Sequence, residues 1–82
     1  MATKTTQTAT EAYRDRMTDV RSLMDLLKTE LRLHERKAKA DLRNWGYAGD
    51  LGYIKDRLTD AIAFIGNKDA EDVNRLVDER RA

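Results

Sequence analysis

The stretch YRDRMTDVRSLMDLLKTELRLHERKAKADLRNW, residues 13–45, decides the fold of this chain. Apolar and semi-apolar residues recur along it at alternating spacings of four and three, and no proline or glycine interrupts it. This rhythm is typical of a long helix that lays one side against another helix. We call that side the seam; it comprises Tyr13, Met17, Val20, Met24, Leu27, Leu31, His34 and Ala38. Trp45 falls seven residues after Ala38.

A second, narrower apolar strip lies almost opposite the seam and contains Leu26, Leu33 and Ala40. A helix that is apolar on two sides sits between two neighbours. From about residue 9 to about residue 44 such a helix is roughly 50 Å long, and the rest of the chain is too short to cover it. We therefore expect a symmetric partner to cover it. The expected oligomer interface is Tyr13, Met17, Val20, Met24, Leu27, Leu31 and His34, with Leu26 and Leu33 behind them.

The rest of the chain predicts a second helix that folds back along the first. Thr8 and Glu11 have the spacing of a capping box, so the long helix should begin there, after a Thr-rich tail at 1–7 that we expect to be disordered. Gly46, Gly49 and Gly52 indicate a tight turn, with Gly46 ending the first helix. The spacing then predicts a helix over about 51–65, capped by Asp50 and ended by Gly66.

A short third helix is expected over about 69–80, capped by Asn67 or Asp69. The fold class is thus all-α: a single domain over 8–82, with a long N-terminal helix, a helical hairpin return and a short third helix. We expect these to assemble into an oligomeric helical bundle.

Basic side chains form a band along the long helix, which we call the ridge. Its members are Arg14, Arg21, Lys28, Arg32, Arg36, Lys39 and Arg43, with Asp25 among them. The simpler interpretation is a solvated flank, or pairing with the second half of the chain, because residues 1–44 have a net charge of +3 and residues 45–82 of −2. The alternative is contact with phosphates or with an acidic protein.

The segment Trp45-Gly46-Tyr47 also has two interpretations. The aromatic rings either plug the end of the hairpin or, if exposed, anchor a partner, because Trp and Tyr are favoured at binding hot spots. A phosphate-binding loop is disfavoured, since these glycines follow a helix rather than a strand and no Lys-Ser/Thr pair comes after them.

Composition restricts the class of protein further. Eighty-two residues with 38% charged and 6% aromatic residues suit a small domain of solvated helices, and the chain has no cysteine for disulfide or thiol chemistry. The N-terminus has no apolar signal region, and no apolar run approaches membrane-spanning length. We therefore expect a cytoplasmic protein without a membrane partner.

Catalysis and cofactor binding find no support in the sequence. Ser22 lies within the long helix, with no histidine close in sequence to activate it. Glu30 and His34 are four apart and could face one metal ion, but two ligands are too few, so we expect no metal, no cofactor and no catalytic residue. A helix-turn-helix is disfavoured because residues 69–81 carry five acids against three arginines.

These observations favour a small non-enzymatic interaction protein, a scaffold or adaptor, that forms a homodimer or higher oligomer through its long helix. A larger protein partner is compatible with the same surface. The alternative is a nucleic-acid-binding protein that uses the ridge without sequence specificity.

Overall fold

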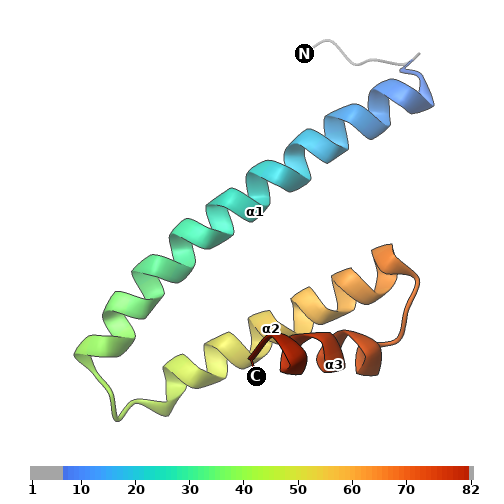
Figure 1. The fold of residues 1–82 in the computed structure, drawn as a ribbon. Coiled ribbons are helices and arrows are strands. Elements are labelled where there is room, and N and C mark those ends of the chain that lie inside the picture. Colours follow the sequence, from blue (N-terminus) through green and yellow to red (C-terminus); the bar gives the residue numbers. More distant parts are fainter. Residues whose placement is uncertain (1–6, 82) are drawn as a thin grey trace. The chain divides into compact units, whose positions relative to one another are not determined.

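The computed structural model describes residues 7–81, and all regular structure among them is helical. In chain order the described helices are α1 (Ala9–Ala40), α2 (Trp45–Gly66) and α3 (Ala70–Arg81) (Figure 1). The all-α class and the order of a long helix followed by two more are therefore confirmed. The expected disordered tail covers 1–7, and its residues 1–6 lie outside the described part of the chain.

A reciprocal capping box starts α1, as the sequence predicts. The backbone N–H of Glu11 donates to the Thr8 hydroxyl oxygen at 3.1 Å, and the backbone N–H of Thr8 donates to the Glu11 carboxylate at 3.0 Å. Two backbone donors that a helix start leaves without partners are thereby satisfied. The helix then continues without a break through the whole seam.

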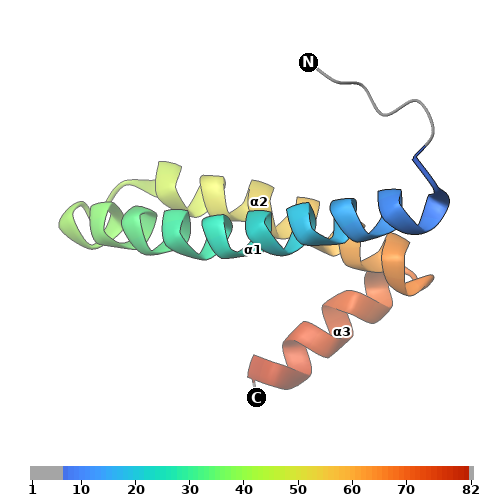
Figure 2. The same cartoon turned by 90° about the horizontal axis from the view of Figure 1, so that it is seen from above.

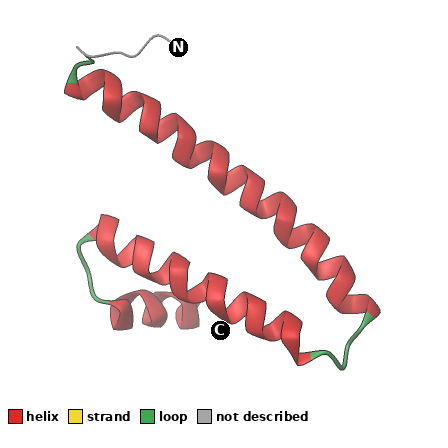
Figure 3. Cartoon of the chain, turned by 180° about the vertical axis from the view of Figure 1, so that it is seen from behind, coloured by secondary structure: helices red, strands yellow, loops and turns green. Residues whose placement is uncertain are grey.

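The end of α1 is a correction, because the helix stops at Ala40 and not near Asn44. Asn44 instead caps α2: its backbone is extended (φ −87°, ψ 102°), and its side chain accepts a hydrogen bond from the Gly46 N–H at 2.8 Å. A residue in this extended conformation cannot also continue the preceding helix. Residues 41–44 therefore form the short loop between α1 and α2 (Figure 3).

The start of α2 is a second correction. The helix begins at Trp45, so Gly46, Gly49 and Gly52 lie inside it and do not form the expected turn, and Asp50 is not its cap. None of the glycines has a positive φ angle. Glycine permits a turn without imposing one, whereas Asn at the N-cap supplies a hydrogen bond that favours the helix directly.

The C-terminal end of α2 is a Schellman motif centred on Asn67. This residue adopts the left-handed conformation (φ 52°, ψ 51°), its N–H donates to Phe64 O, and the Lys68 N–H donates to Ala63 O at 3.0 Å. The helix ends at Gly66, as predicted, but Asn67 belongs to the end of α2 and does not cap α3. Asp69 precedes α3, and its carbonyl oxygen accepts from the N–H of Asp72 at 3.1 Å.

The helices divide into two compact units, one holding α1 and the other holding α2 and α3. Within the second unit, α3 turns back after residues 67–69, runs obliquely to α2 and contacts it (Figures 1 and 2). The buried residues among those described are Thr59 of α2 and Val73 of α3, which is only 3% exposed. The Thr59 hydroxyl donates to Lys55 O at 2.8 Å, so its burial leaves no unsatisfied donor. The single domain over 8–82 stays a prediction.

Candidate interaction surfaces

The seam lies along α1, which buries no side chain in the structure. Tyr13, Val20 and Met24 are exposed, Met24 by 55%. The remaining seam members are half-buried; they are Met17, Leu27, Leu31, His34 and Ala38. The structure thus brings all seam residues onto one continuous helix, while their assignment as an oligomer interface stays a prediction.

The second strip is also exposed, with Leu26 at 60% and Leu33 accessible as well. Sequence reasoning missed Leu23, which is exposed too and stands three residues before Leu26 and four before Leu27. At these spacings Leu23 lies beside both residues and joins the seam to the second strip. The signal was the local density of apolar residues, because five of the eight residues 20–27 are apolar.

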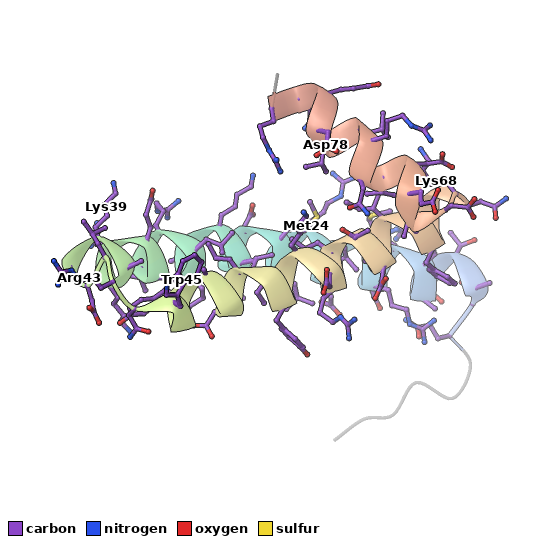
Figure 4. The ribbon with its side chains drawn as sticks, turned by 90° about the horizontal axis from the view of Figure 1, so that it is seen from below. Met24, Lys39, Arg43, Trp45, Lys68 and Asp78 are labelled. Atoms are coloured by element: carbon purple, nitrogen blue, oxygen red, sulfur yellow. The ribbon has the colours of Figure 1, made fainter. Side chains whose placement is uncertain are left out.

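The ridge is exposed but shorter than expected. Six members lie on α1, whereas Arg43 falls beyond Ala40 in the loop 41–44, so it does not belong to the same helical band. Lys39 forms an exposed ion pair with Glu35 at 3.8 Å, near the end of α1 (Figure 4). An Arg32 guanidinium nitrogen donates to the Thr29 hydroxyl at 3.3 Å. Such exposed contacts are weak, so they do not prevent these cations from binding an anion.

The two aromatic residues at the start of α2 differ in exposure. Trp45 is the first residue of the helix and is 85% exposed, so its ring does not plug the end of a hairpin. Tyr47 is half-buried and has an interaction partner. A role of Trp45 and Tyr47 as an anchor for a partner stays a prediction.

The side of α2 that carries Tyr53 holds a small polar cluster. The Arg57 guanidinium lies over the Tyr53 ring, 5.4 Å from its centroid, and also pairs with the Asp60 carboxylate at 3.1 Å. A cation over an aromatic face is attracted by the ring quadrupole. The exposed Tyr53 ring is therefore explained in part by a contact inside its own helix.

A groove lies between α2 and α3, with a volume of about 450 Å³. Its lining is Ile62 of α2 and Val73, Leu76, Val77, Glu79 and Arg80 of α3. Val73 is buried, whereas Leu76 is 47% and Val77 38% exposed. The sequence predicts Val73, Leu76 and Val77 on one face of the third helix, but only the packing of α3 on α2 separates the buried residue from the exposed ones.

No metal or membrane feature emerges from the described residues. Among them, no group of three or more His, Asp or Glu side chains is placed to hold a metal ion. Glu30 and His34 both lie on α1, where His34 is half-buried and has an interaction partner. Within residues 7–81, no helix is both long enough and apolar enough to cross a bilayer.

Comparison with known proteins adds no assignment: no family model matches the chain, and no curated protein or solved structure is significantly similar to it.

Proposed function

We propose that this chain acts by binding rather than by catalysis, as a small scaffold or adaptor that self-associates through the seam of α1. The observation that carries the proposal is the contrast between α1 and the second unit. In α1, 32 residues long, no side chain is buried, although apolar residues occupy the seam and the second strip. The second unit, by comparison, buries Val73.

The exposed apolar residues of α1 form a surface suited to another helix. The cluster of Val20, Leu23, Met24 and Leu27 is concentrated in two turns and on one side of α1, where a facing helix can cover it. Burying apolar surface contributes roughly 25 cal/mol for each Å² removed from water. A second copy supplies the same cluster, which suits a two-fold symmetric contact. The proposal includes the predicted hairpin, in which the second helix folds back along the long helix, and the assembly of these helices into an oligomeric bundle.

The experiment compares two single substitutions on α1 by sedimentation equilibrium over a micromolar concentration range. Met24→Glu places a charge on the seam, whereas Thr18→Glu places the same charge on an exposed polar flank of α1, away from the seam and the second strip. We expect Met24→Glu to weaken association by about tenfold or more, equivalent to about 1.4 kcal/mol. Thr18→Glu should leave association within about twofold of the parent chain.

Circular dichroism of both variants checks that the helices remain formed. A parent chain that stays a folded monomer throughout the concentration range contradicts the proposal. Equal effects of Met24→Glu and Thr18→Glu would contradict the assignment of the seam as the contact.

A second candidate function, binding of nucleic acid without sequence specificity, is favoured by one observation. The six ridge cations on α1 are all exposed. Cations spaced along one side of a helix can follow successive phosphates, although Asp25 interrupts the band.

A further inference from the structure

We infer that an exposed face of α2 is a second self-association surface, which pairs with the same face of another copy of this chain in antiparallel orientation. We call it the aromatic face; its four members are Tyr53, Arg57, Asp60 and Phe64. It lies within the second unit and is separate from the seam of α1, so the inference does not rest on the function proposed above.

The members of the aromatic face share one side of α2. They follow one another at intervals of four, three and four residues, which at about 100° per residue keeps them within about 60° of the helix circumference. Ile62, which lines the groove beside α3, lies almost opposite the centre of this face. The packing of α3 therefore leaves the aromatic face uncovered, with Tyr53 62% and Phe64 86% exposed.

The charged members order the face within one chain. Arg57 lies over the Tyr53 ring, 5.4 Å from its centroid, and pairs with the Asp60 carboxylate at 3.1 Å. Both charged side chains are more than half exposed. A guanidinium has five N–H donors and a carboxylate has two acceptor oxygens, so this pair has capacity for a second pair of the same kind. Side chains that are ordered before binding lose less entropy when a partner arrives.

The order of the four residues selects a second copy as the partner. Read in either direction along the helix, the face presents an aromatic ring, a charge, the opposite charge and an aromatic ring. The midpoint between Tyr53 and Phe64 is also the midpoint between Arg57 and Asp60. When an identical helix lies antiparallel across this midpoint, Tyr53 of each copy meets Phe64 of the other. Arg57 meets Asp60 in the same way, and both kinds of contact are favourable.

The same charges select the orientation. A parallel pair in register would set Arg57 against Arg57 and Asp60 against Asp60, which is unfavourable. In the antiparallel pair a like charge comes close only at the edge of the face, where Asp56 lies about 70° from the centre and near Asp60 of the other copy. Asp56 is farther from the contact than Arg57, so attraction between Arg57 and Asp60 dominates.

The size of the face limits the strength of this contact. From Tyr53 to Phe64 the helix rises about 17 Å, so the contact is smaller than the roughly 800 Å² that each partner contributes to a standard interface. Disulfide trapping detects such a weak contact better than sedimentation does. The chain has no cysteine, so each introduced thiol reports on one position.

The test mixes two variants of the full chain, Tyr53→Cys and Phe64→Cys, under mild oxidation. In the antiparallel pair the thiol of one variant lies opposite the thiol of the other, within disulfide reach, and the second aromatic contact of the pair stays intact. We therefore expect mixed dimers to form about fivefold faster or more than dimers of either variant with itself. Mass spectrometry separates the three products. Mixed dimers in only the proportion of random collision would overturn the inference, and so would a predominance of dimers between identical variants.

The matched control mixes Lys55→Cys with Ile62→Cys. These exposed positions are centred on the same midpoint but lie on the opposite side of α2. They should give mixed dimers only in the proportion of random collision, and circular dichroism checks that all the variants remain helical. A preference for mixed dimers as strong as that of Tyr53→Cys with Phe64→Cys would show that the aromatic face is not the contact.

Charge exchange tests the pairing of Arg57 with Asp60. In both cysteine variants, Arg57→Glu sets a carboxylate against Asp60 and should slow mixed-dimer formation by about three- to tenfold at low salt. Arg57→Glu combined with Asp60→Arg should restore the rate, and Asp56→Asn should raise it. If the combined variant remains as slow as Arg57→Glu alone, the charge pairing is wrong. Met24→Glu, which acts on the seam, should leave the preference for mixed dimers in place, so the two surfaces are tested separately.

Discussion

Thr8 and Glu11 hold each other in a reciprocal capping box, in which each residue's backbone N–H donates to the other's side chain, at 3.0 and 3.1 Å. We expect Thr8→Ala to reduce the stability of α1 by about 1 kcal/mol, because the Glu11 N–H loses its acceptor. Urea titration followed by circular dichroism measures this change. The control is Thr10→Ala, which lies inside the helix and should be neutral or slightly stabilising. A similar loss in both variants would show that the cap does not matter.

Gly49 and Gly52 lie inside α2, and in the described part of the chain a Cβ atom added to either meets no heavy atom within 4 Å apart from its chain neighbours and the nearby backbone of its own helix. Replacing each by alanine should therefore raise stability by about 0.5–1 kcal/mol, since alanine has less backbone entropy to lose. Thermal unfolding measures the effect. Gly46→Ala is the contrasting variant, because its Cβ would lie 2.9 Å from the Asn44 side-chain oxygen that caps α2. Destabilisation by Gly49→Ala and Gly52→Ala would contradict the helical assignment of this segment.

Asn67 adopts the left-handed conformation with a φ of 52°. Asn67→Ala should destabilise the second unit by about 1 kcal/mol, because a Cβ atom without a local hydrogen-bonding group is disfavoured in this region. Asn67→Gly should be neutral or stabilising, since glycine adopts this conformation without strain. Chemical unfolding of the two variants side by side checks the prediction. It is wrong if alanine is tolerated as well as glycine.

The ridge predicts weak binding of duplex DNA or RNA that falls steeply between about 50 mM and about 200 mM salt. Fluorescence anisotropy with a labelled duplex measures this dependence. Arg32→Glu/Arg36→Glu should abolish the binding while the chain remains oligomeric. The matched control is Lys55→Glu/Lys68→Glu, which makes the same charge change outside α1 and should weaken binding far less. Absence of binding by the parent chain at low salt would remove nucleic acid from the candidate partners.

Local interactions were readable from the sequence. The capping box at Thr8 involves partners three residues apart, and the end of α2 is marked by Gly66, directly after the helix predicted over about 51–65. The same holds for the all-α class, because a repeat of three and four residues reports directly on which side chains share a helix face. These features depend on neighbours within one or two turns, which the sequence displays side by side.

The boundary between α1 and α2 shows how a pattern can mislead even at short range. Trp45 stands seven residues after Ala38, so the apolar pattern predicted a first helix that continued past its actual end at Ala40. Asn44 carried the opposite signal, since asparagine is a strong N-cap residue. In the structure the Asn44 side chain accepts a hydrogen bond from the Gly46 N–H, and α2 begins at Trp45. Gly46, Gly49 and Gly52 therefore lie inside this helix.

By itself, the sequence determined three helices and their order, because these follow from hydrogen bonds and packing between near neighbours. Only the tertiary structure decided that Val73 is buried while Leu76 and Val77 stay exposed, and that Ile62 joins them to form a groove. The three α3 residues are equally apolar in the periodic pattern. What separates them is the angle at which α3 crosses α2, and that angle is set by contacts between two different helices, which the spacing within one helix does not record.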